Sequence, residues 1–98
     1  MESYIPITRS DLAQIQLVPA QLAGEEAVQI RWRSLHKATF FGNVMEEKVR
    51  VYLQGKEAVY RLETTLWACT KEWVVFKDSV RVPVTVVLRV ESYQASEV

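Results

Sequence analysis

The stretch KVRVYLQGKEAVYRLETTLWAC, residues 48–69, decides the fold predicted for this chain. Apolar and polar side chains alternate on both sides of Gly55-Lys56, which is typical of two half-buried strands joined by a two-residue turn. This turn sets four favourable cross-strand pairs, namely Leu53–Ala58, Val51–Tyr60, Val49–Leu62 and Lys48–Glu63. The same register places Arg50 opposite Arg61, and such a like-charged pair is unfavourable unless an anion lies between the two side chains.

The alternation continues through TTLWACTKEWVVF, residues 64–76. With a three-residue turn at 70–72, the interior contains Leu66, Ala68, Val74 and Phe76, and the outer face carries Tyr52, Trp67, Cys69 and Trp73. A two-residue turn at Lys71-Glu72 would instead place Trp73 inside. An outer face with this much aromatic area requires a cover, because a solvated sheet rarely exposes a large apolar patch.

Two further strands are predicted upstream of the hairpin. Val28, Ile30 and Trp32 alternate with polar residues, and residues 38–45 follow as a second strand in which Gly42 suggests a bulge. Before them, Thr8 and Asp11 have the spacing of a capping box. This spacing predicts a short helix over residues 8–18.

Downstream of the hairpin, valines alternate over residues 82–90, with a change of phase near Val87. Pro83 cannot donate a ladder hydrogen bond, so its strand lies at an edge or bends. A strand, a one-turn break and a closing strand fit this segment best.

Together these elements predict a single domain over residues 1–98. It is mainly β: a short helix at 8–18, a five- or six-stranded barrel over 28–91 and a flexible tail at 92–98. The pattern resembles SH3-like and Sm-like β-barrels. The opening YIPITRSDL, residues 4–12, is similar to the Rho-binding antiterminator family, and the general character of the chain is similar to that of small uncharacterised cyanobacterial proteins.

The charge of the chain is balanced overall but uneven along it. Twelve Lys and Arg match twelve Asp and Glu, yet residues 31–61 carry seven basic residues against three acidic ones. A neutral total gives no general attraction to nucleic acid or anionic lipid. A single cysteine, the lack of a signal-peptide pattern and the lack of a long apolar run indicate a cytoplasmic protein with no membrane partner.

The sequence offers little material for catalysis. His36 and Cys69 are its only histidine and cysteine, and a structural zinc site needs four nitrogen or sulfur ligands. Three scattered glycines cannot form a phosphate-binding loop. We therefore expect no catalytic, metal or cofactor site, and we interpret Cys69 as a small half-buried strand residue.

Three covers compete for the outer aromatic face. The first is the N-terminal helix, with Leu12 and Ile15 over Trp67. The second is a protein partner or a homo-oligomer that binds Tyr52, Trp67 and Trp73, since Trp, Tyr and Arg dominate binding energy at interfaces. The third is single-stranded RNA, with phosphates contacted by Arg31, Arg33, Arg50 and Arg61. The sequence favours a non-catalytic protein-interaction module, with an Sm-like RNA-binding protein as the alternative.

Overall fold

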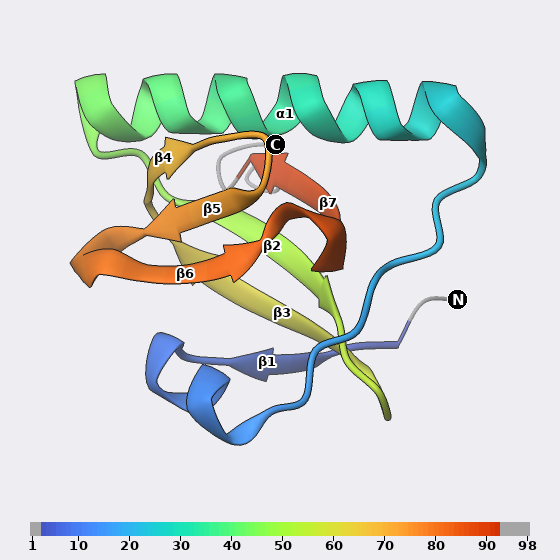
Figure 1. Ribbon diagram of the computed structural model, residues 1–98. Helices are drawn as coiled ribbons and strands as arrows, with labels where there is room; N and C mark the ends of the chain where they lie inside the picture. Colours follow the sequence, from blue (N-terminus) through green and yellow to red (C-terminus); the bar gives the residue numbers. More distant parts are fainter. Residues whose placement is uncertain (1–2, 93–98) are drawn as a thin grey trace.

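The computed structural model describes residues 3–92, in which two β-sheets lie beneath one long helix (Figure 1). The elements are, in chain order, β1 (Ile5–Ile7), η1 (Arg9–Gln14), α1 (Gly24–Met45), β2 (Val49–Gln54), β3 (Val59–Thr64), β4 (Leu66–Cys69), β5 (Trp73–Phe76), η2 (Lys77–Ser79), β6 (Val80–Pro83), η3 (Val84–Val86) and β7 (Val87–Ser92). Apart from Ser92, the predicted tail over 92–98 lies outside the described residues.

The strands divide into a four-stranded sheet of order β1-β3-β2-β7 and a three-stranded sheet of order β4-β5-β6. Only β1 pairs in parallel, with β3; all other pairings are antiparallel. β3 and β4 are separated by Thr65 alone, so one continuous segment passes from the first sheet to the second. The described residues therefore form a mixed α/β domain of two sheets and a helix. The two sheets do not close into a barrel, so the prediction of a mainly β barrel is only roughly right.

The largest correction concerns residues 24–45, which form α1 rather than two strands. Its buried stripe is Leu35, Ala38 and Gly42, at the three- and four-residue spacing of one helix face. Val28, Ile30 and Trp32, whose alternation predicted a strand, all lie exposed on this helix. The helix ends at Glu46 (φ 52°), whose left-handed backbone and N–H bond to the Gly42 carbonyl form a C-terminal cap.

Gly42 allows α1 to lie directly on β4. A Cβ atom at this position would overlap the carbonyl oxygen of Leu66 and would press on the Thr65 methyl group. Next to it, the Asn43 side-chain amide donates to the Trp67 carbonyl (3.0 Å) and to the Thr39 carbonyl (2.9 Å). Gly42 therefore marks the closest approach of helix and sheet and not the bulge expected from the sequence.

The β2–β3 hairpin is confirmed, but its register differs by two residues from the prediction. Val51 pairs with Leu62 and Leu53 with Tyr60, and residues 55–58 form the connection. A shift of two keeps each side chain on its predicted face, because successive strand residues alternate sides. It also places Arg50 opposite Glu63, so the predicted Arg50–Arg61 pair does not exist.

The remaining predicted elements are present in shorter form. The N-terminal helix is the 3-10 helix η1, which has the predicted capping box: the Thr8 N–H donates to the Asp11 carboxylate (2.8 Å). Pro83 ends β6, which is the edge strand of its sheet, and η3 supplies the one-turn break before β7.

The hydrophobic core lies between the two sheets and under α1. Leu35 enters from the helix, Val51 and Leu62 from the first sheet, and Val74 and Phe76 from the second. All five are almost completely buried. The outer faces of both sheets and the outer side of α1 are therefore the surfaces left for binding.

Candidate interaction surface

The outer face of the first sheet is a network of charged pairs. Arg50 in β2 lies between Glu63 of β3 and Glu91 of β7, with nitrogen–oxygen distances of 3.0 and 3.6 Å. These two carboxylates raise the pKa of Arg50, chiefly through the hydrogen bond that Arg50 donates to Glu63. Its guanidinium is thus committed to groups of the same chain.

Tyr52, on the same face, is covered by neighbours and is not an exposed anchor. Its side chain is only 3% exposed. The Tyr4 ring meets it edge-on at 5.6 Å, and the Arg89 guanidinium lies 4.0 Å from its ring centroid. The Tyr52 ring is therefore already covered within this chain, which gives no support to the prediction that it belongs to a protein interface.

Arg61 completes this covered face. Its guanidinium lies 4.4 Å from the Tyr4 ring centroid, and it donates to the Tyr4 hydroxyl at 2.7 Å. Its Nε is buried and has no hydrogen-bond partner among the described residues. The positive charge of the guanidinium is instead stabilised by a cation–π contact with the Tyr4 ring. We call the face formed by Tyr4, Arg50, Tyr52, Arg61, Glu63, Arg89 and Glu91 the closed face.

The four arginines predicted to bind RNA do not form one surface. Arg50 and Arg61 lie on the closed face, whereas Arg31 and Arg33 belong to α1. Arg31 is half-buried and donates to the Val87 carbonyl (3.1 Å), and burial lowers its pKa. Arg33 is exposed on the helix.

The second sheet differs because its strand β4 carries an irregularity. Leu66 pairs with Phe76, but the register then shifts, so that Ala68 pairs with Val75 and Cys69 with Val74. Paired residues share a face, so Cys69 turns toward the core and Ala68 turns outward. This reverses the predicted placement of these two residues and confirms that of Leu66, Val74 and Phe76.

Trp67 and Trp73 flank the Ala68–Val75 pair and are both accessible, with 43% and 37% of their surface exposed. The Arg81 guanidinium of β6 lies 4.4 Å from the ring centroid of Trp73. η1 does not cover Trp67, so the first of the three predicted covers is absent. We call the surface formed by Trp67, Ala68, Trp73, Val75 and Arg81 the open face.

Trp73 is held in place by the three-residue turn predicted at 70–72. The Thr70 hydroxyl accepts from the N–H of Glu72 (3.2 Å) and of Trp73 (3.0 Å), and the Thr70 N–H donates to the Trp73 carbonyl (2.8 Å). Such a hydroxyl-to-backbone turn fixes the chain locally. The backbone that carries Trp73 is therefore fixed before binding, so little conformational entropy of this turn would be lost when a partner binds.

Cys69 and His36 have separate environments. The Cys69 thiol donates weakly to the Thr70 carbonyl (3.6 Å), and burial raises its pKa, so the thiol is neutral near pH 7. His36 lies against the Trp32 ring, with 4.0 Å between the ring centroids. Among residues 3–92, no three His, Cys, Asp or Glu side chains gather as a metal site would require.

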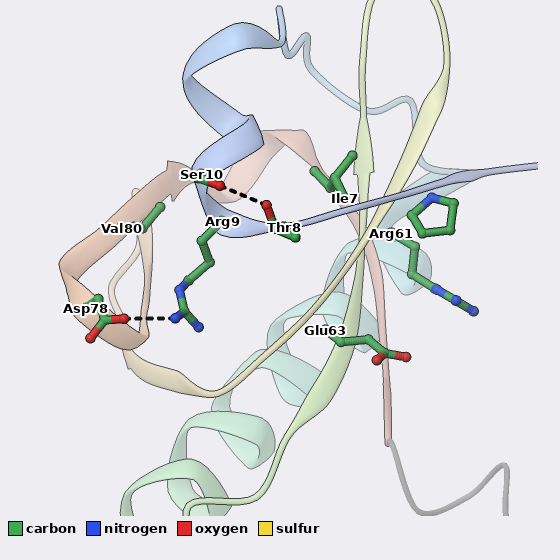
Figure 2. Close-up of a pocket in the computed structure, with 9 residues that line it drawn as sticks. Ile7, Thr8, Arg9, Ser10, Arg61, Glu63, Asp78 and Val80 are labelled. Carbon is green, nitrogen blue, oxygen red and sulfur yellow. Dashed lines mark hydrogen bonds and ion pairs between the residues drawn. The ribbon is translucent and has the colours of Figure 1, made fainter.

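A cleft of about 660 Å³ lies where β1 and η1 face η2 and β6 (Figure 2). Arg9 crosses it to Asp78 (2.8 Å) and also donates to the Thr64 hydroxyl (3.1 Å). Arg61 and Glu63 also line it, but their side chains point away from this pair (Figure 2). Arg9 and Asp78 are thus paired with each other, whereas Glu63 is paired with Arg50 and Arg61 donates to the Tyr4 hydroxyl. The charged groups that line the cleft therefore do not converge on an empty position.

Sequence reasoning missed one exposed group altogether. Phe40, Val44 and Met45 protrude from the C-terminal half of α1 and are the most exposed large apolar side chains of the described residues. The sequence carries only a weak signal for them, because the helix face that Leu35, Ala38 and Gly42 bury is marked by small residues. Once the helix is known, that face places Phe40 and Val44 on the opposite side.

Comparisons of the chain with protein-family models, with curated proteins and with solved structures find no match. Within the described part of the chain, no helix has the length and apolar character needed to cross a bilayer. What the protein does must therefore be argued from its own surfaces.

Proposed function

We propose that this chain is a cytoplasmic, non-catalytic protein-interaction module whose open face binds a partner protein. The observation that supports it is the exposure of Trp67 and Trp73 on one sheet, with Arg81 stacked on the second indole. Trp and Arg are enriched among the residues that dominate binding energy at interfaces. An exposed indole costs free energy in water, and this cost is recovered when a partner covers the ring.

The chemistry of the open face defines the partner. Its centre is apolar, and its charged member, Arg81, already lies over an aromatic ring, where it can also receive a carboxylate. Lys71 lies in the adjacent turn and adds a second cation. The expected partner is a protein segment with apolar or aromatic anchors and an acidic residue beside them.

We also propose that the domain is a variant of the SH3-like and Sm-like architecture. Its support is the arrangement of β3, β2 and β7 in one sheet and β4 to β6 in the other, with the single turn η3 between β6 and β7. In this proposal β1 and α1 precede the strands β2 to β7, and α1 lies across both sheets, contacting β4 and β7 (Figure 1).

RNA binding is the weaker reading. Affinity for phosphates comes from Lys and Arg side chains that neutralise them and so release the counterions of the nucleic acid. Arg50 already contacts two carboxylates of its own chain. Tyr52, which would have stacked on a base, is covered by Tyr4 and Arg89. A stacking role would fall to the exposed Trp67 or Trp73 instead, and the experiment below tests it.

The experiment is selection of a random peptide library on the protein, followed by affinity measurement for the selected peptides. We expect peptides with apolar and acidic residues whose affinity falls at least tenfold for Trp73→Ser and Trp67→Ser. Phe40→Ser is the matched control, since Phe40 is also an exposed aromatic residue but lies on the outer side of α1. Peptides that bind all three variants equally would contradict the proposal.

A parallel titration with single-stranded RNA homopolymers addresses the other reading. We expect no change of tryptophan fluorescence at low salt. A saturable change that weakens steeply as salt is added and requires Trp73 would instead establish nucleic-acid binding.

A further inference from the structure

A second surface, on α1, is independent of the open face. The three most exposed large apolar side chains of the described residues are Val44 (64%), Met45 (62%) and Phe40 (60%), all within six positions of one helix. Single exposed apolar residues are common on protein surfaces, whereas a cluster at one helix end marks an interaction site. The side of the helix opposite Phe40 and Val44, at Gly42, is already occupied by β4. Met45 lies at the C-terminal end of the same helix.

Charges of opposite sign lie on the two sides of this cluster. Arg33 and Lys37 are one helical turn apart on the N-terminal side, on the same outer strip as Phe40 and Val44. Glu46 and Glu47 follow the helix directly on the C-terminal side. Within residues 3–92 the structure shows no ion pair for any of these four charged side chains.

The C-terminal end keeps its negative character when its other groups are included. Lys48 adds one positive charge to the two glutamates. The carbonyl groups at the end of α1 contribute a partial negative charge, as helix C-termini do. The surface therefore runs from positive, through apolar, to negative along the helix axis.

We propose that this surface binds a second copy of the chain, through antiparallel pairing of the two α1 helices. A two-fold axis between Phe40 and Val44 sets Phe40 against the partner's Val44. The same axis brings Lys37 beside the partner's Glu47. Because the contact is isologous, each pairing occurs twice.

The order of charges selects this occupant and this direction. In an antiparallel pair the basic end of each helix meets the acidic end of the other, and the apolar centres coincide. In a parallel pair Lys37 would meet the partner's Lys37, which is unfavourable in the middle of an interface. A surface that is complementary to itself after a two-fold rotation fits a homodimer.

The dimer is expected to be weak. The contact covers about three turns of one helix, which is below the area of a typical permanent dimer. Its charged pairs lie at the rim, so that salt screens them. Association should therefore depend on protein concentration and weaken as ionic strength rises.

The test is sedimentation velocity of the full chain from micromolar to about millimolar concentration at low salt. We expect the mass to rise from that of one chain toward that of two, and Phe40→Ser to weaken association at least tenfold. Phe40 is mostly exposed, so this variant should fold; circular dichroism checks that it does. A wild-type chain that stays monomeric throughout would overturn the proposal.

The charge pairing has its own test. Lys37→Glu and Glu47→Lys should each weaken association, and the double variant should restore it, because the swapped charges again pair across the axis. Lack of restoration would overturn the antiparallel geometry. Trp73→Ser should leave the dimer intact. Loss of association in Trp73→Ser but not in Phe40→Ser would move the self-interface to the open face and refute this proposal.

Discussion

The closed face and the open face both place an arginine over an aromatic ring, but the ring is buried on the first face and exposed on the second. Each combines aromatic rings with arginine on the outer side of a sheet. On the closed face, Tyr52 is covered by Tyr4 and Arg89 of the same chain. On the open face, Trp73 has Arg81 over part of its ring and solvent over the rest.

The difference lies in which strands stand beside each ring. In the first sheet, β2 has β3 on one side and β7 on the other, and both neighbours bring charged side chains of the required sign. In the second sheet, β6 is an edge strand and β4 is interrupted by its register shift. Aromatic and arginine content alone therefore cannot distinguish a surface that is covered by its own chain from one that is exposed to solvent.

The largest expected effect is on the closed face. Tyr52→Ala should lower the free energy of unfolding by about 3–4 kcal/mol, because it removes a buried aromatic ring. Urea denaturation measures this. Trp73→Ala should cost far less, and Tyr52→Phe should retain most of the stability because the ring remains. Equal losses for Tyr52→Ala and Trp73→Ala would break the comparison.

An intermediate effect is expected where α1 holds the strand that carries Trp67. In an ordinary helix interior, replacing glycine by alanine is stabilising by about 0.5–1 kcal/mol. Gly42→Ala should instead destabilise by about 1–3 kcal/mol, because the added methyl group meets the Leu66 carbonyl. Urea denaturation checks the sign, with Gln29→Ala on the exposed side of α1 as a near-neutral control. A stabilised Gly42→Ala would refute the close contact.

The smallest effect concerns Cys69, two residues after Trp67 and facing the opposite way. Burial raises its pKa above the ordinary value of 9.0, so the folded protein holds less thiolate than the unfolded chain at pH 8. Labelling by a disulfide reagent should be several-fold slower in the native protein than in urea.

The same shift predicts a weak pH dependence of stability. A raised pKa stabilises the folded state below the unfolded value, and that contribution is lost as the pH rises through 9.0 and the folded pKa. Cys69→Ala should remove this component from denaturation curves recorded between pH 8 and 10. Native labelling as fast as in urea would show that Cys69 lies on the open face.

The alternation of residues 49–76 predicted the strands and the side of most residues correctly. The predicted hairpin register was wrong by two residues. Apolar residues pair with each other in both registers, so only the pairing of the charged residues distinguishes the two. Arg50 has Glu63 available only when the connection spans residues 55–58. The phase change near Val87 correctly predicted the break that η3 forms.

The helix could not be identified from the same kind of pattern. Val28, Ile30 and Trp32 alternate as strand residues do, yet all three are exposed on α1. The residues that bury its inner face include alanine and glycine, which carry almost no hydropathy signal. Close packing of α1 against β4 requires small residues on the buried face of the helix. The amphipathic pattern by which a helix is identified from its sequence is therefore weak in this segment.

The outward placement of Trp67 and, given the three-residue turn, of Trp73 followed from local alternation, whereas the burial of Tyr52 did not. Its covers, Tyr4 and Arg89, lie far from it in the sequence on both sides. The outward orientation of Ala68 depends on a register shift that cannot be predicted from the residue types in β4. Both outcomes are properties of tertiary pairing.

The parallel pairing of β1 with β3 affects the order in which the domain can fold during synthesis. β1 leaves the ribosome first, yet its partners Tyr60 to Leu62 are more than fifty residues away. At about 5–20 residues per second, the first strand waits roughly 3 to 11 seconds before β3 has been synthesised. Arg89, the other cover of Tyr52, arrives later still. The face that is most completely sealed in the finished protein is thus the last to be sealed during synthesis.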